Sequence, residues 1–317
     1  MKIAIESKQL ERITIKQNAP IAGPESCHSG PASESILRDT DFRFAYSMAG
    51  VLIASGVFHL LLLAVTGADW EGSISPRKPA LFGISAGLTA WSIVWVLTKV
   101  FPRRGDGLFA NVITVSLVLE VALITMQFWR GVPSHFNHST GLDTAIEFAM
   151  LILILEVTLG IFWLTIRCHR LPEMDAAMAV AIRGGMWLLL ISCGLGIGIS
   201  VLGTLNQLSG DAPERWGRAG VLKYPHGVAL HAIQTLPILA WFLGRLQVPR
   251  SEKLVFSAVI AQTMFLGVAI WQTALGRARF DMEPFAMVLF GIAVLLSAFP
   301  VVAAVAAVMR LAMKRNK

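Results

Sequence analysis

Residues 144–167 read TAIEFAMLILILEVTLGIFWLTIR, a run in which only Glu147, Glu156 and Arg167 carry charge. A helix rises about 1.5 Å per residue, so about 20 apolar residues cross the hydrocarbon core of a bilayer, which is roughly 30 Å thick. The stretch is long and apolar enough to cross it. It therefore predicts a membrane-spanning helix.

Runs of the same kind recur along the chain, separated by connections that contain glycine and proline. The chain is 55% hydrophobic with a mean hydropathy of +0.64, and only 15% of it is charged, against roughly 25% in soluble domains. The predicted fold class is all-α, a polytopic integral membrane helical bundle, with residues 41–312 as an eight-helix transmembrane domain. The spans are predicted at residues 43–66, 79–101, 108–130, 144–167, 178–205, 226–246, 254–276 and 285–309.

Lysine and arginine are distributed unevenly between the two sides of this bundle. With the N-terminus in the cytoplasm, nineteen of the 27 Lys and Arg residues fall on the cytoplasmic side. Cytoplasmic loops carry such an excess, so we expect both termini inside, in a bacterial inner membrane. The net charge of +7 then indicates contact with anionic lipid rather than with nucleic acid. Residues 1–40 are expected to form a disordered cytoplasmic tail, and residues 313–317 a basic one.

The predicted orientation can be measured with reporter fusions. A reporter that works only in the cytoplasm, fused after Lys317, is expected to be active, because eight spans return the chain to the side on which it started. The same reporter inserted between the third and fourth spans is expected to be inactive. Activity in the opposite pattern would show that the span count or the orientation is wrong.

The connection before residue 144 carries more polar chemistry than a turn requires. It reads QFWRGVPSHFNHSTGLD at residues 127–143. Arg130 is expected either to reach the membrane interface beside Trp129 or to bind an anion. Asp143 is expected either to cap the next helix or to face a site. The candidate site residues in and just after this segment are Gln127, Arg130, His135, Asn137, Asp143 and Glu147.

A second polar segment, KYPHGVALHAIQTLP, occupies residues 223–237 at the start of the sixth predicted span. His231 and Gln234 are three residues apart and share a helix face. His226 and His231 are five apart, so an uninterrupted helix would not direct both rings at one ion. His59 in the first span lies at a depth of roughly 12 Å, close to the roughly 8 Å of His231. The residues predicted to converge in one pocket open to the periplasm are His59, His135, His231 and Gln234.

Other polar residues fall on the same predicted side or near the middle of the bilayer. Lys78, Gln272 and Arg277 belong to the periplasmic side. Glu120 and Glu156 lie near the middle of consecutive spans, where two carboxyl groups could share a proton or bind a cation. The alternative is that they are protonated and hydrogen-bonded within the bundle. For each intramembrane histidine, the alternative is a hydrogen-bonding strut between helices.

Both segments resemble motifs of a family of uncharacterised bacterial polytopic membrane proteins. The matching motifs are Trp129-Arg130-Gly131…Ser134-His135-Phe136-Asn137…Thr140…Asp143 and His226…Leu230-His231…Gln234…Leu236-Pro237. Lys78-Pro79 and Gln272 with Gly276-Arg277 are similar to further positions of that family. The resemblance extends from the first to the seventh predicted span. It implies that these positions belong together, and it implies no activity.

Two classes of function fit these residues. In the first, His59, His135, His226 and His231 hold a metal or haem in a membrane enzyme that acts on a lipid, a quinone or another small amphiphile. Imidazoles with a carboxylate suit zinc, and two imidazoles on different helices suit a b-type haem. In the second class, the cluster binds a small polar solute in a transporter or sensor, and Glu120 and Glu156 couple protons. A scaffold without a ligand is a third hypothesis.

Overall fold

A computed structural model describes residues 41–72 and 74–315. The predicted tail at residues 1–40 lies outside the described residues. The helices are α3 (Arg43–Thr66), α4 (Arg77–Leu97), α5 (Asp106–Trp129), α6 (Gly141–Arg167), α7 (Ala176–Leu208), α8 (Lys223–Leu230), α9 (Ala232–Arg245), α10 (Ser251–Ala274) and α11 (Pro284–Arg315). The strands β1 (Arg215–Trp216) and β2 (Gly220–Val221) pair antiparallel in a short hairpin before α8.

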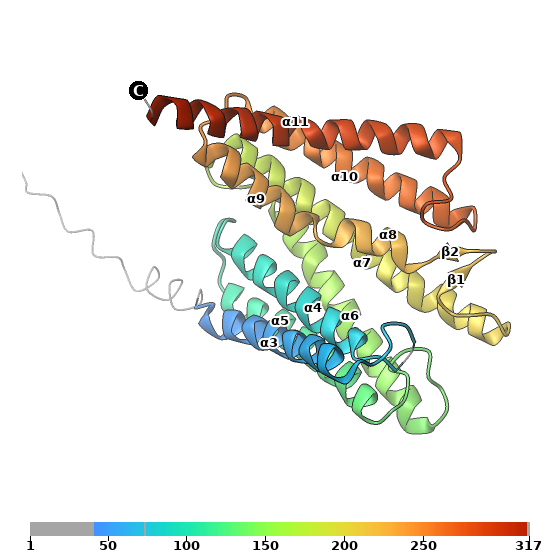
Figure 1. Cartoon of the computed structure of the whole chain (residues 1–317). Helices are drawn as coiled ribbons and strands as arrows, with labels where there is room; N and C mark the ends of the chain where they lie inside the picture. The colour runs from blue at the N-terminus through green and yellow to red at the C-terminus, as the bar shows by residue number, and fades with distance from the viewer. Residues whose placement is uncertain (1–40, 73, 316–317) are drawn as a thin grey trace, which may run out of the picture. The chain divides into compact units, whose positions relative to one another are not determined.

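The described ranges contain eight helical segments that are long and apolar enough to cross a membrane, with α8 and α9 together forming one of them. This confirms the predicted all-α polytopic bundle. The predicted span ends differ from the helix ends by a few residues. The largest difference is in α11, which continues to Arg315, so part of the predicted C-terminal tail is helical. The start of α3 and the end of α11 lie at the same end of the bundle (Figure 1).

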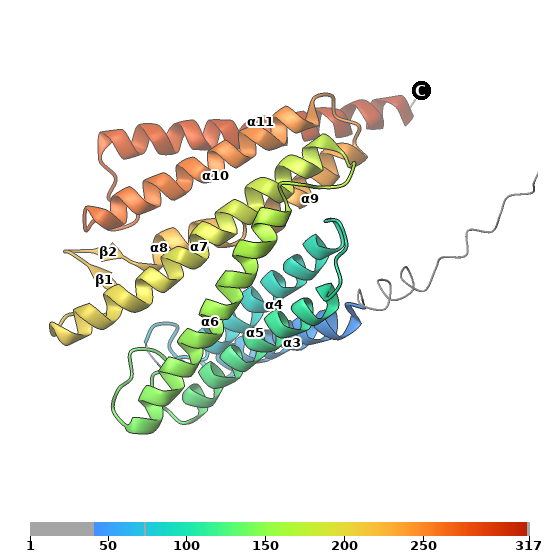
Figure 2. The same cartoon turned by 180° about the vertical axis from the view of Figure 1, so that it is seen from behind.

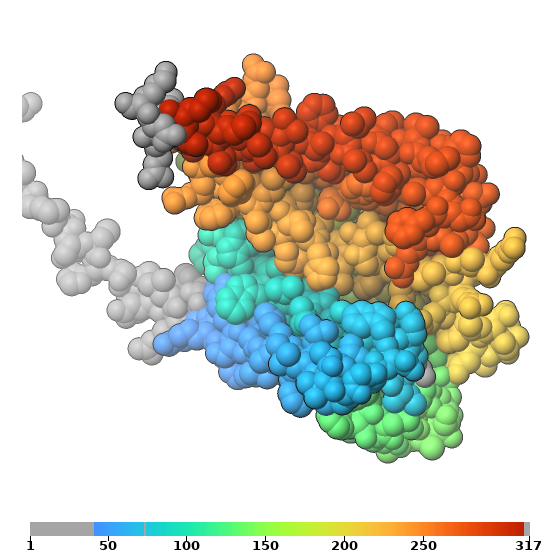
Figure 3. Space-filling view, in the orientation of Figure 1, coloured from blue at the N-terminus to red at the C-terminus, as the bar shows by residue number. Residues whose placement is uncertain are grey.

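The spans pack in two groups of four. Helices α3 to α6 pack against one another, as do α7 to α11, and the groups meet where α6 adjoins α7 and where α4 touches α9 (Figures 1 and 2). In the space-filling view, the blue α3–α4 part and the amber α8–α9 part adjoin on the face toward the viewer (Figure 3). The second span of one group thus borders the second span of the other.

The closest packing is between α3 and α4, and glycine makes it possible. A Cβ atom on Gly56 would lie 2.5 Å from the backbone nitrogen of Ile84, and one on Gly83 would lie 2.8 Å from the Cα of Gly56. Small residues let helix backbones approach in lipid, where dispersion contacts replace the hydrophobic effect. This contact fixes which face of α4 points toward α3, and therefore which face points toward α9.

The sixth span, predicted at residues 226–246, is interrupted at His231. His231 has φ −97° and ψ 11°, and it separates α8 from α9. Figure 1 shows the two pieces as separate coils joined by an unwound link. Pro237 lies in α9, where it lacks the N–H that would bond the carbonyl four residues earlier. The break lies about eight residues, or roughly 12 Å, below the start of the span.

Candidate functional site

Helix α4 has a polar face that is directed away from its contact with α3. Successive helical residues turn by about 100°, so Lys78, Phe82, Ser85 and Thr89 fall within about 60° of one another, while Gly83 lies well away from them. The Ser85 Oγ atom is 3.4 Å from Nε2 of His231. This face of α4 therefore points toward the interrupted helix.

Two buried polar side chains follow one turn beyond the Ser85–His231 contact. The Gln234 amide nitrogen and oxygen, and the Thr89 hydroxyl, are buried and have no hydrogen-bond partner among the described residues. Spans two and six run in the same direction, so Thr89 and Gln234 are at similar depth. We call the set Lys78, Phe82, Ser85, Thr89, His231 and Gln234 the polar seam.

Lys78 begins the polar seam at the end of the bundle that the sequence predicts to be periplasmic. Its side chain is largely buried, and within residues 41–72 and 74–315 no hydrogen bond or ion pair to its ammonium is found. Lys223, Glu214, Glu147 and Arg77 lie within electrostatic range of it. A largely buried ammonium without a direct partner is costly and marks a candidate for function.

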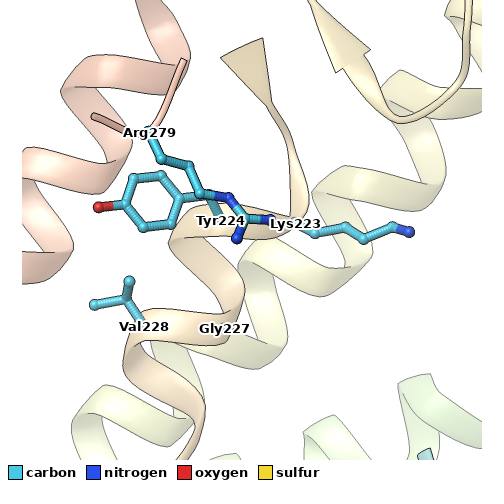
Figure 4. Close-up of a pocket in the computed structure, with 5 residues that line it drawn as sticks. All are labelled: Lys223, Tyr224, Gly227, Val228 and Arg279. Atoms are coloured by element: carbon cyan, nitrogen blue, oxygen red, sulfur yellow. The ribbon is translucent and has the colours of Figure 1, made fainter. Parts of the chain in front are cut away.

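An open pocket of about 240 Å³ lies beside α8, and it is distinct from the polar seam. Tyr224, Gly227, Val228, Lys223 and Arg279 line it. Figure 4 shows the Arg279 side chain over the Tyr224 ring, with the guanidinium carbon 5.7 Å from the ring centroid, while Lys223 extends away from both. Lys223 forms an ion pair with Glu214.

His135 lies at the mouth of the polar seam. Its ring centroid is 5.7 Å from that of Phe82, and its Nδ1 atom is 3.0 Å from the Ser134 hydroxyl. Burial, together with the positive charges of Lys78 and Lys223, lowers the pKa of His135 from 6.5 to about 3. The ring is therefore neutral at pH 7 and adds no charge to the mouth.

The lowered pKa of His135 makes stability depend on pH. Between pH 3 and 6.5 the unfolded chain binds a proton at this ring and the folded chain does not, so stability is complete above pH 6.5 and falls as the pH falls. Each unit below 6.5 is expected to cost at most about 1.4 kcal/mol. Between pH 7.5 and 5.5, the wild type should lose more thermal stability in detergent than His135→Gln does. His169→Gln, which removes an exposed histidine, should behave like the wild type, and equal losses in all three proteins would contradict this prediction.

The loop that carries His135 is held by Glu147 of α6. Its two carboxylate oxygens accept from the backbone N–H groups of Phe136, at 2.9 Å, and Asn137, at 3.0 Å. Phe136 adopts φ 57°, which is uncommon for a residue other than glycine. The Phe136 carbonyl accepts from the Gln207 amide at 2.8 Å. Helix α7 has 33 residues, roughly 50 Å, so its last turns extend past the bilayer core to this loop.

Asn137 and Glu147 thus position the loop. The Asn137 amide donates to the Pro133 carbonyl at 3.0 Å, and its side-chain oxygen accepts from Ser139 N–H. His138 Nε2 is 3.5 Å from a Glu147 oxygen. The polar groups of Asn137 and Glu147 are therefore taken up by contacts that hold the loop in place.

Arg130 and Asp143 bind each other in the structure. Arg130 pairs with Asp143 at 2.8 Å and donates to the Gln127 side-chain oxygen. Gln127 donates to Asp143 at 3.0 Å. The cap of α6 is Thr140, whose hydroxyl accepts from Asp143 N–H at 3.1 Å and donates to the Asp143 carboxylate at 2.7 Å. Asp143 therefore lies in the first turn of α6, where a carboxylate stabilises the positive end of the helix dipole. The same carboxylate neutralises the charge of Arg130.

The candidate ligand histidines have separate partners. His59 Nδ1 donates to the Ser55 carbonyl at 2.8 Å, and its ring packs near Phe128 and Trp129 of α5. His226 Nδ1 donates to the Ser192 carbonyl of α7 at 2.8 Å. His135 and His231 lie along α4. Convergence of His59 with His135, His231 and Gln234 in one pocket remains a prediction.

In the part of the chain that the structure describes, no group of three or more His, Cys, Asp or Glu residues is placed to hold a metal ion. The residues present therefore do not fit the predicted zinc centre. The b-type haem hypothesis remains a prediction that no contact here supports.

The remaining candidates lie away from the polar seam. Gln272 donates to the Asp281 carbonyl at 2.8 Å, and Arg277 lies 3.4 Å from the same oxygen, so both order the α10–α11 connection. Glu156, on the exposed surface of α6, accepts from Ser116 of α5 at 2.8 Å. Glu120 is buried one turn from Ser116 on α5. A proton shared by the two carboxyl groups remains a prediction.

Phe82, Ser85 and Thr89 are not among the site residues predicted from the sequence. The available signal was the spacing of Lys78, Ser85 and Thr89, which places three polar residues on one face of an otherwise apolar helix. Comparisons with protein-family models, with curated proteins and with solved structures found no match to this chain. The resemblance of the two motifs to a bacterial membrane family therefore remains a prediction.

Proposed function

We propose that this integral membrane protein is a carrier for a small polar solute, which passes along the polar seam between α4 and α8–α9. The observation that carries the proposal is the interruption of a membrane-spanning helix at His231, opposite Ser85 of α4. Many secondary transporters bind their substrates near the bilayer midplane at discontinuous helices, where backbone groups are released from the helical ladder.

The position of the helix break supports a carrier rather than a hydrogen-bonding strut that only joins two helices. It lies where the two groups of four spans meet, and movement of one group against the other would expose the polar seam to either side of the membrane. A brace between helices needs one hydrogen bond, and the Ser85–His231 contact supplies it. The buried polar groups of Thr89 and Gln234, which have no hydrogen-bond partner within the described ranges, exceed that need.

The metal-dependent enzyme is not proposed, because the described residues bring no three ligands together. The carrier and sensor hypotheses differ in one measurable property. A carrier must open its site to both sides in turn, whereas the site of a periplasmic sensor is reached from one side only.

Cysteine accessibility measures this property without knowledge of the solute. In a background in which Cys27, Cys168 and Cys193 are replaced by alanine, Ser85→Cys and Gln234→Cys are each introduced and treated with a charged, membrane-impermeant thiol reagent. The reagent is added to right-side-out and to inverted membrane vesicles. We expect modification at both positions from both sides.

Leu88→Cys is the matched control, because Leu88 lies on the exposed, lipid-facing side of α4 and should react from neither side. Modification of the two seam positions from the periplasmic side alone would contradict the carrier and favour a sensor. Failure to react from either side would favour the scaffold.

A further inference from the structure

We infer that the polar seam takes an anion, a carboxylate or a phosphate group, and that Lys78 is the residue that recognises it. The inference concerns the same site as the proposed function. It does not require that the anion be carried across the membrane.

The other charges around Lys78 have partners of their own. Lys223 pairs with Glu214, and Arg77 lies 3.5 Å from Glu71. Glu147 is occupied by two backbone N–H groups of the His135 loop and by His138. The largely buried ammonium of Lys78 is therefore the charge at this mouth without a direct counter-charge in residues 41–72 and 74–315. An anion would compensate it and recover the desolvation cost.

The His135 loop helps to keep the mouth selective for anions. His135 lies beside Phe82 and is neutral at pH 7. It therefore carries no charge that would attract the anion away from Lys78, and it provides no negative charge to pair with Lys78. The Glu147 carboxylate, which lies within electrostatic range of Lys78, accepts instead from the backbone N–H groups of Phe136 and Asn137. The positive potential at the mouth is thereby preserved.

Deeper in the polar seam, the polar side chains are neutral donors. Ser85 and Thr89 carry hydroxyls, and the buried amide of Gln234 has no partner among the residues described. The six residues of the polar seam include no carboxylate, so nothing in it repels an anion.

The length of the polar seam places the anion site at its mouth. Lys78 and Thr89 are eleven residues apart on α4, roughly 16 Å along the axis, so a small anion cannot touch both. An anion paired with Lys78 therefore binds at the mouth, and Thr89 and Gln234 lie deeper along the polar seam. An elongated amphiphile with an anionic head could place its head at Lys78 alone.

Ligand-dependent thermal stability tests the inference on purified full-length protein. The soluble probes are inorganic phosphate and acetate in an uncharged detergent, at ionic strength held constant with sodium chloride. The lipid probe is phosphatidylglycerol in nanodiscs, compared with phosphatidylcholine. At saturation we expect at least one anionic probe to raise the unfolding midpoint of the wild type by about 4 °C or more.

Three variants identify the recognising residue. Lys78→Met should abolish the rise, Lys78→Arg should retain it, and Arg77→Met, which removes a neighbouring cation that has its own carboxylate, should retain it as well. Without a probe, Lys78→Met should melt no lower than the wild type, because it removes an uncompensated charge. That result shows that the variant folds.

The outcomes separate the sources of the anion and the two proposals. A rise with phosphate or acetate indicates a soluble solute, and a rise with phosphatidylglycerol alone indicates a lipid headgroup. Either supports the inference if Lys78→Met abolishes it. No rise with any probe, or a rise that persists in Lys78→Met, overturns it. The rise in unfolding midpoint could depend on Lys78 while cysteines in the polar seam react with the thiol reagent from one side only. That result would support the anion site and contradict the carrier proposal.

Discussion

Arg167→Ala is expected to lower the free energy of unfolding by about 3–5 kcal/mol, the usual cost of removing one partner of a buried ion pair. The Arg167 guanidinium makes two hydrogen bonds to the Asp106 carboxylate, at 2.6 and 2.9 Å, and both side chains are almost fully buried. It also donates to the Phe101 carbonyl at 2.7 Å and lies 4.4 Å from the Trp163 ring centroid. The alanine variant leaves the Asp106 charge buried without its counter-charge, although the Arg103 backbone N–H still donates to it at 2.9 Å.

Denaturant titration in detergent measures this loss. Arg170→Ala, which removes an exposed arginine from the end of the same segment, is the matched control and should change stability by less than about 0.5 kcal/mol. The double variant Arg167→Met with Asp106→Leu should recover much of the loss, because no uncompensated charge remains. If Arg167→Ala is as stable as Arg170→Ala, the ion pair does not join α5 to α6.

Asp143→Ala is the second large expected effect, a destabilisation of about 3 kcal/mol. Its carboxylate accepts from Gln127, Arg130 and Thr140, and it is almost fully buried. The variant leaves the Gln127 amide N–H without its acceptor and Arg130 without its counter-charge. It also removes half of the reciprocal contact with the Thr140 cap. Unfolding in detergent, followed by circular dichroism, gives the magnitude.

The Asp143 prediction has a functional counterpart. The network anchors one end of the His135 loop, so Asp143→Ala should also raise the reactivity of a cysteine placed at Ser134, which is buried in the wild type. Asp281→Ala, in the connection before α11, is the control and should leave that reactivity unchanged. Unchanged reactivity in Asp143→Ala would mean that Glu147 alone holds the loop.

Local chemistry could be predicted only in part from the two motifs. The segment 127–143 was correctly identified as unusually polar, yet Arg130, Gln127 and Asp143 satisfy one another rather than a ligand. Those partners are close in sequence, but choosing among them requires the path of the loop, which Glu147 and Gln207 set from other helices. The break at His231 was missed because no glycine or proline marks that position.

The sequence by itself determined the eight spans, because bilayer thickness sets the length of each apolar run and this constraint is local to each helix. The predicted span at residues 43–66 coincides with α3. Only the tertiary structure decided that Ser85 meets His231, 146 residues later, and that His59 packs near Phe128 and Trp129. In lipid, helix adjacency depends on which faces fit together, as at Gly56 and Gly83, and an apolar run does not encode the identity of its neighbour.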